Sequence, residues 1–142
     1  MTRGEAWFTH LSSALVGGTG LVFGWMLYFA EPTDEFAIVN HPWQPELQAL
    51  HILFAPLLVF ACGLFWRDHV WKRVKGGFPA RRRSGLLLFS LLGVMVLSGY
   101  LVQTSVEVQW RLAWVWIHGV SSSLWLLGYV IHQFAPRQKQ AP

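Results

Sequence analysis

The sequence is poor in charged residues and in cysteine. Only 13% of its 142 residues are charged, roughly half the usual share of a soluble domain, whereas 54% are hydrophobic. So few charges cannot cover a water-facing surface of this size, which argues against a soluble globular protein. The single cysteine, Cys62, excludes an internal disulfide, a paired-cysteine redox motif, a thiolate metal cluster and covalent haem attachment through two cysteines. Six histidines stand out against this background.

Four long stretches lack acidic and basic residues altogether. They cover residues 6–30, 47–66, 84–106 and 112–136. About 20 apolar residues cross the hydrocarbon core as a helix, and the continuous apolar character excludes the alternating strands of a membrane barrel. No internal repeat is visible. We therefore predict an all-α membrane protein, a four-transmembrane-helix bundle that forms a single domain over residues 1–142. The expected helices are listed by range: about 6–30, 47–72, 84–106 and 112–136.

The basic residues predict the orientation in the membrane. Ten of the eleven lie at the two termini or in the connection between the second and third helices, and only Arg111 lies elsewhere. The connection between the first two helices carries four acids and no base. By the positive-inside rule both termini are cytoplasmic, and the protein is a multi-pass protein of a bacterial inner membrane. The basic connection is an orientation signal, so no nucleic-acid partner is expected.

Four histidines lie inside the apolar segments, where an ionisable residue marks a functional site by default. His10 and His132 each lie about one turn from the cytoplasmic face, whereas His51 and His118 lie one to two turns below the outer face. His118 and His132 are 14 residues apart on one helix, about 21 Å along its axis and only about 40° apart around it. Two depth-matched pairs of imidazoles suit bis-histidine ligation of two stacked haems, which carry electrons and bind no substrate.

Other interpretations of these residues stay open. An intramembrane histidine can also be a hydrogen-bonding residue of helix packing, or part of a bare-metal site or a proton relay. The glycines of the first and last helices would let a porphyrin face approach the backbone, or would serve close helix packing. They are Gly17, Gly18, Gly20, Gly24, Gly119 and Gly128.

Two histidines lie outside this pattern. His41, in the outer connection, is expected to be solvated. His69 lies 18 residues after His51, five full turns on a regular α-helix, and therefore points the same way near the inner headgroups. It is open to three interpretations: an interface residue, part of a quinone pocket, or a ligand of the inner haem that competes with His10.

This arrangement of four helices and four spaced histidines resembles the cytochrome b (gamma) subunit of membrane-bound respiratory formate dehydrogenases and related complexes. These subunits have four helices, cytoplasmic termini and two b haems, with ligands from the first, second and fourth helices. The resemblance implies His10 and His132 as ligands of an inner haem, and His51 and His118 as ligands of an outer haem. It covers essentially the whole chain and depends on four spaced histidines and the topology.

These observations predict a membrane subunit with two haem b groups that carries electrons across the bilayer. One electron partner is a quinone, menaquinone or ubiquinone, near the inner haem. The other is a redox protein on the periplasmic side, namely a dehydrogenase, an iron-sulfur subunit or a multihaem cytochrome. Arginine offers a two-point fork for carboxylates, so haem propionates would meet Arg111 outside and a basic residue inside. The inner candidates are Arg3, Arg67 and Arg137.

Two alternatives to this function remain open at the level of sequence. One is a stand-alone small cytochrome b oxidoreductase that reduces quinone from a diffusible donor. The other is a haem-free membrane anchor or assembly subunit. In the favoured interpretation the chain has no complete substrate site of its own, and enzymatic activity would belong to the complex.

Overall fold

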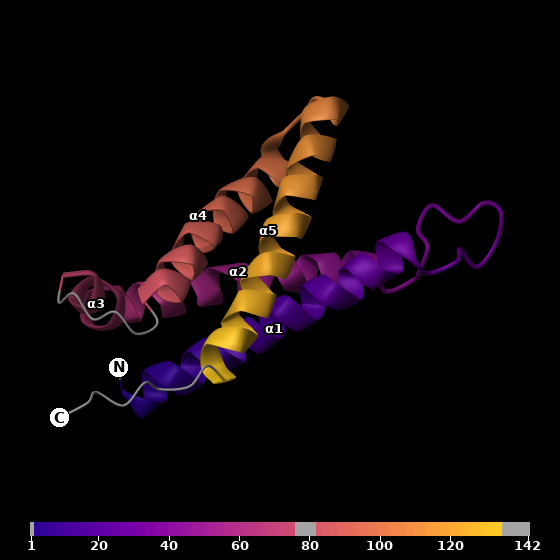
Figure 1. The fold of residues 1–142 in the computed structure, drawn as a ribbon. Coiled ribbons are helices and arrows are strands. Elements are labelled where there is room, and N and C mark those ends of the chain that lie inside the picture. The colour runs from indigo at the N-terminus through magenta and orange to yellow at the C-terminus, as the bar shows by residue number, and fades with distance from the viewer. Residues whose placement is uncertain (1, 76–81, 135–142) are drawn as a thin grey trace. The chain divides into compact units, whose positions relative to one another are not determined.

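The computed structural model describes residues 2–75 and 82–134, and every element of regular secondary structure within these ranges is helical (Figure 1). Four segments are long and apolar enough to cross a membrane, which confirms the predicted all-α fold with four spans. The elements are α1 (Arg3–Tyr28), α2 (Gln44–Phe65), the π-helix η1 (Trp66–Trp71), α3 (Lys72–Lys75), α4 (Arg82–Thr104) and α5 (Val108–Phe134).

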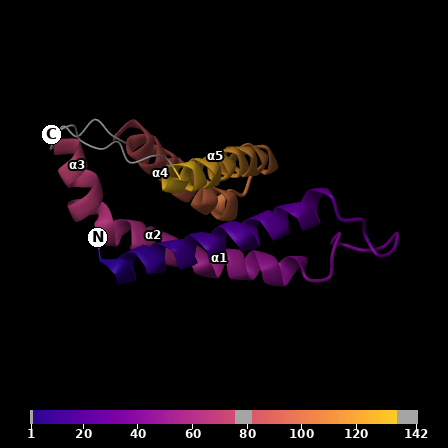
Figure 2. The same ribbon diagram turned by 60° about the horizontal axis from the view of Figure 1, so that its bottom comes forward.

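The chain forms two compact units, Met1–Trp66 and Arg67–Pro142. In the first, α1 packs against α2, and in the second, α4 packs against α5 (Figures 1 and 2). We call these two helix pairs hairpin one and hairpin two. The arrangement of the units relative to each other is not determined, so each is described by itself.

Hairpin one begins with a capping box. The Glu5 backbone N–H donates to Thr2 Oγ1 at 3.2 Å, and the Thr2 N–H donates to Glu5 Oε2 at 2.7 Å. This reciprocal pair satisfies backbone donors that a helix start leaves open, and it explains why α1 begins before the charge-free stretch. The buried face of α1 is then lined mainly by small side chains, which let the two helices approach closely. The residues buried in α1 are Thr9, Ser12, Ser13, Val16 and Met26.

Hydrogen bonds of Asn40, His41 and Gln44 hold the connection from α1 to α2. Asn40 Nδ2 donates to the Leu27 carbonyl at 2.9 Å, which attaches the connection to the last turns of α1. The Asn40 N–H donates to Gln44 Oε1 at 3.3 Å, and the Gln44 N–H donates to the His41 carbonyl at 3.0 Å. Pro45 follows in the first turn, where its missing N–H costs nothing. α2 therefore begins at Gln44, three residues before the predicted start.

The end of α2 differs from the prediction. A single helix was expected to about residue 72, but the α-helix ends at Phe65 and gives way to the π-helix Trp66–Trp71. A π-helix has more residues per turn than an α-helix, so a count of 100° per residue cannot be carried through it. The five-turn count that placed His69 on the same face as His51 assumed a regular α-helix, which the structure does not have beyond Phe65.

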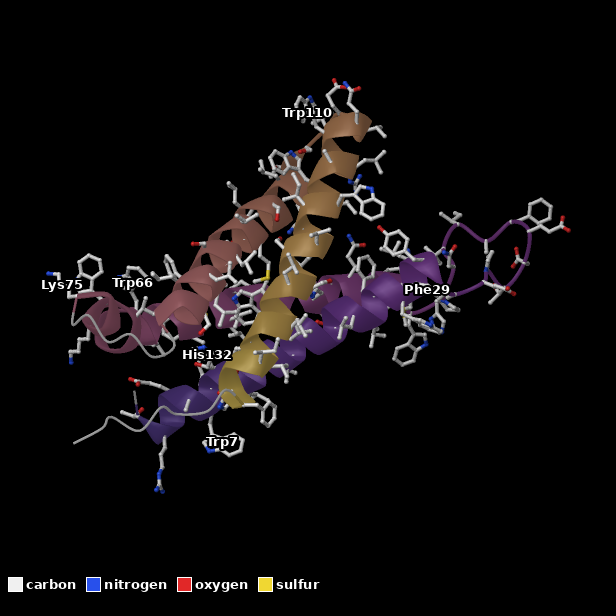
Figure 3. All side chains as sticks on the ribbon, in the orientation of Figure 1. Trp7, Phe29, Trp66, Lys75, Trp110 and His132 are labelled. Carbon is white, nitrogen blue, oxygen red and sulfur yellow. The ribbon has the colours of Figure 1, made fainter. Side chains whose placement is uncertain are left out.

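Hairpin two has a shorter connection, and both apolar and polar side chains are buried between its two helices. Only residues 105–107 separate α4 from α5. Leu92, Met95 and Ser98 are buried on one face of α4, and α5 contributes Ser121 and Trp125. Away from these seams, large apolar side chains cover both hairpins, as lipid contact requires (Figure 3).

Candidate functional site

His51 of α2 is held against the backbone of α1. Its Nδ1 lies 3.1 Å from the Val16 carbonyl oxygen and 3.3 Å from Thr19 Oγ1. The ring lies directly over Gly20, where an added Cβ would come within 2.8 Å of Cε1. We call Val16, Thr19 and Gly20 the His51 seat. The three residues fall within one and a half turns of α1, so a regular helix presents them together.

His118 of α5 is held in the same way against α4. Its Nδ1 lies 2.9 Å from the Met95 carbonyl oxygen and 3.3 Å from Ser98 Oγ. The ring lies over Gly99, where an added Cβ would come within 3.0 Å of Cε1. Met95, Ser98 and Gly99 form the His118 seat. In both seats the hydroxyl follows the carbonyl residue by three positions and the glycine follows it by four.

The carbonyl contacts determine where the imidazole proton lies. A carbonyl oxygen can only accept, so Nδ1 of His51 and of His118 must carry the hydrogen. In the neutral imidazole Nε2 then has the lone pair, which is the form that binds a metal. Both rings are half-buried between the helices of their own hairpin. The two seats thus present the same tautomer by the same contacts.

The two histidines predicted near the inner face are bound differently. His132, near the end of α5, lies with Nδ1 3.0 Å from Ser84 Oγ of α4 and is half-buried (Figure 3). His10 is exposed on α1, and its ring lies edge-on to Trp7 with centroids 6.2 Å apart. Each predicted pair takes one histidine from each unit, so the pairing itself stays a prediction.

An aromatic side chain lies midway between the two histidines of α5. Trp125 follows His118 by seven residues and precedes His132 by seven, so all three share one face of the helix. Trp125 is only 6% exposed, and its ring stacks on Tyr129 with centroids 5.2 Å apart and planes 9° apart. The stretch of α5 between His118 and His132 is therefore covered by aromatic rings.

His41, which was expected to be solvated, is partly exposed and also makes contacts within the chain. It is half-buried, its Nδ1 accepts the Trp43 N–H at 3.2 Å, and its ring lies 6.4 Å from that of Trp25. Because Nδ1 accepts, the proton of the neutral ring lies on Nε2, the opposite tautomer to that of His51 and His118. His41 helps to shape the start of α2.

The structure describes only some of the residues that were predicted to contact haem propionates or quinone. Arg111 is exposed in the first turn of α5, seven residues before His118 and thus on the same face of the helix. Arg3 is exposed in the first turn of α1. The side chains of Arg67 and His69, and the whole of Arg137, lie outside the described residues.

The glycines separate into distinct roles. Gly20 and Gly99 receive an imidazole ring, whereas an added Cβ at Gly128 would meet Leu88 Cδ2 at 3.1 Å, a contact of helix packing. At Gly18, Gly24 and Gly119 an added Cβ would meet nothing within 4 Å.

Sequence reasoning missed the two hydroxyls and Gly99. The signal that could have found them is a Thr-Gly or Ser-Gly pair on the helix that precedes each histidine helix. It occurs here as Thr19-Gly20 and Ser98-Gly99, and a third such pair, Ser84-Gly85, has its hydroxyl 3.0 Å from Nδ1 of His132.

Within residues 2–75 and 82–134, no group of three or more His, Cys, Asp or Glu side chains gathers as a site for a bare metal ion. A bis-histidine site needs only two ligands, so this observation concerns clusters and not paired imidazoles. Comparisons of the chain with protein-family models, with curated proteins and with solved structures give no match.

Proposed function

We propose that this chain is a dihaem b-type cytochrome subunit that carries electrons across a bilayer between a periplasmic-side redox partner and the quinone pool. The observation that carries the proposal is the pair of matched seats for His51 and His118. A histidine that serves only helix packing has no need to carry its proton on the same nitrogen in two different hairpins. A metal ligand does need this, because its other ring nitrogen is ordinarily held by a carbonyl or carboxylate.

The donor set fits a haem better than a bare ion. Neutral imidazoles bring no net charge into the membrane, and the charge-free helices around them supply no carboxylate. Zinc or copper sites commonly recruit carboxylate or sulfur ligands in addition. A haem with two imidazole ligands supplies one-electron transfer and has no open position for a substrate.

The length of α5 supports two levels of haem. The helix runs without interruption from Val108 to Phe134, so His118 and His132 are about 21 Å apart along its axis. In the proposal His51 and His118 hold the outer haem, and His10 and His132 hold the inner one. Trp125 keeps water out of the space between the two levels, and Arg111 offers its guanidinium to an outer propionate.

The charge distribution supports an orientation and two partners. Ten of the eleven basic residues would face the cytoplasm, together with both termini. The acidic connection would then face the periplasm, where Phe36 and Ile38 are 91% and 100% exposed. Such apolar side chains among acids suit a redox protein with a basic contact surface. Quinone would react at the inner haem, within reach of the cytoplasmic headgroups.

The gamma-subunit resemblance supports the same proposal, with the whole complex acting as the oxidoreductase. A pyridine-haemochrome assay on the purified, detergent-solubilised chain tests it, and we expect two haem b per chain. One haem or none would contradict the dihaem proposal, and none would favour the haem-free anchor. Reduction of quinone from a small donor without any partner protein would favour the stand-alone oxidoreductase instead.

A further inference from the structure

Each seat contains a hydroxyl whose own proton is used elsewhere. Thr19 Oγ1 donates to the Leu15 carbonyl at 2.6 Å, and Ser98 Oγ donates to the Val94 carbonyl at 2.7 Å. These are the usual bonds of Ser and Thr to the preceding turn of a helix. Because the hydroxyl hydrogen points to the backbone, the oxygen lone pairs are left to face the imidazole 3.3 Å away.

We propose that Thr19 and Ser98 are positioning residues that, with the carbonyls of Val16 and Met95, keep His51 and His118 protonated on Nδ1 and so present Nε2 to a haem iron. The inference rests on the proposed dihaem function and adds the residues that select the ligating nitrogen. Two acceptors share the Nδ1 hydrogen in each seat, so a ring flip that put Cδ2 in the place of Nδ1 would lose both contacts. The glycine below the ring leaves room for the imidazole to lie against the facing helix.

His41 shows that the tautomer is a local property of each site. Its Nδ1 accepts the Trp43 N–H, so its proton lies on the other nitrogen. The described residues therefore contain both imidazole tautomers, and the form with the Nε2 lone pair occurs at His51 and His118, where a carbonyl oxygen and a hydroxyl of the facing helix both lie at Nδ1. Hydrophobic packing alone would not choose between the two nitrogens.

The loss of one hydroxyl should have a measurable but partial effect. Removal of a partner that orients a metal ligand typically weakens metal binding about 10–100-fold. Since the Val16 or Met95 carbonyl stays in place, we expect the low end of this range, about tenfold weaker binding of the outer haem. The imidazole also becomes a poorer electron donor, so the midpoint potential of that haem should shift to a more positive value.

The test uses the full chain with Thr19→Val and with Ser98→Ala. Matched controls are Thr9→Val on α1 and Ser121→Ala on α5, because both hydroxyls are buried and donate to their own helix, at 2.8 Å and 2.7 Å. Thr19→Ser is the conservative variant and should restore the wild-type values. The first readout is ¹⁵N NMR of histidine-labelled protein without haem, with resonances assigned through single histidine variants.

In the wild-type chain we expect non-protonated Nε2 for His51 and His118 and protonated Nε2 for His41. Thr19→Val should convert His51 to a mixture of tautomers and leave His118 unchanged, and Ser98→Ala should do the reverse. The second readout is titration with haem b, in which both variants should lose about tenfold in outer-haem affinity while the controls keep it.

Unchanged tautomers, or equal losses in the variants and their controls, would overturn the positioning role. This failure is distinct from failure of the proposed function. A wild-type chain that binds no haem but shows the expected tautomers contradicts the dihaem proposal alone, because the NMR readout needs no cofactor.

Discussion

Hairpin one and hairpin two differ in almost every residue and in the length of their connections, yet each holds one histidine by the same three contacts. Residues 29–43 join the helices of hairpin one, whereas residues 105–107 join those of hairpin two. The His51 seat lies on α1 and faces α2, and the His118 seat lies on α4 and faces α5. In both hairpins the earlier helix supplies the seat and the later helix supplies the histidine.

The difference between the hairpins shows which parts of a seat are constrained. The carbonyl comes from the backbone, so Val16 and Met95 serve equally well. The hydroxyl comes from Thr or Ser, since both bond to the preceding turn. The glycine position tolerates the least change, because a Cβ at Gly20 or Gly99 would come within 2.8 Å or 3.0 Å of the imidazole. The pattern of a hydroxyl residue followed by glycine is not sufficient by itself: at Ser84-Gly85 the hydroxyl lies 3.0 Å from His132 Nδ1, but nothing lies within 4 Å of a Cβ added at Gly85.

The largest expected effect comes from removal of either seated histidine. We expect His51→Ala and His118→Ala each to lose the whole outer haem and to keep the inner one. If the two hairpins supply the two halves of one site, the double variant loses no more than either single variant, which is strong non-additivity. Haem content by pyridine haemochrome measures this. Two lost haems in the double variant would mean that each hairpin serves a separate haem.

The second prediction compares the two candidate ligands of the proposed inner haem, His10 and His69. We expect His10→Ala to lose the inner haem and His69→Ala to keep it, because an axial ligand is essential whereas a neighbouring polar group is not. Reduced-minus-oxidised spectra of the purified variants distinguish the two haems. Loss of the inner haem with His69→Ala but not with His10→Ala would overturn the proposed pairing of His10 with His132.

The seat glycines provide a graded test. Gly20→Ala and Gly99→Ala should displace the ring and cost about 1–3 kcal/mol, as overpacking in a close contact does. Gly20→Ala should be the more severe, since its Cβ would lie 2.8 Å from the ring against 3.0 Å at Gly99. Thermal loss of the outer-haem spectrum measures the effect.

Gly18→Ala and Gly93→Ala are the matched controls, one on each helix, because nothing lies within 4 Å of an added Cβ there. An equal loss in the controls would show that helix flexibility, and not the space under the ring, is the cause.

The smallest effect is expected at Gly128, where the contact is of helix packing alone. Gly128→Ala brings a Cβ to 3.1 Å from Leu88 Cδ2, the mobile end of a flexible side chain. The gain in helix propensity, about 1 kcal/mol, should offset most of the crowding. We expect the thermal stability to change little and both haems to stay, as a melting curve and a visible spectrum would show. Loss of a haem would give Gly128 a role in the site.

The sequence was sufficient to predict the four spans, because charged residues delimit each apolar stretch. It misplaced their starts by a few residues, since capping by Thr2 and Glu5 and the proline after Gln44 extend helices into polar sequence. The π-helix at the end of α2 has no residue pattern that announces it. The argument for His69 depended on regular helical geometry, which does not extend through this π-helix.

The two seated histidines could be singled out from the sequence, but the residues that hold them could not. His51 and His118 stand out because ionisable residues are rare in apolar helices. Thr19 and Ser98 do not stand out, because hydroxyl residues are common in such helices and usually bond to their own backbone. Their contact with an imidazole depends on the rotation of one helix against the next, which tertiary packing sets.

The division of the seats between hairpins has a consequence for biogenesis. Every residue of the His51 seat, and His51 itself, lies within the first 51 positions of the chain, so this half is translated before α4 and α5 exist. Chains are made from the N-terminus and fold in that order. Hairpin one can therefore enter the membrane with its imidazole already oriented, and hairpin two repeats the same step later. The two seats are thus formed one after the other, each within its own hairpin, and neither depends on a contact with the other.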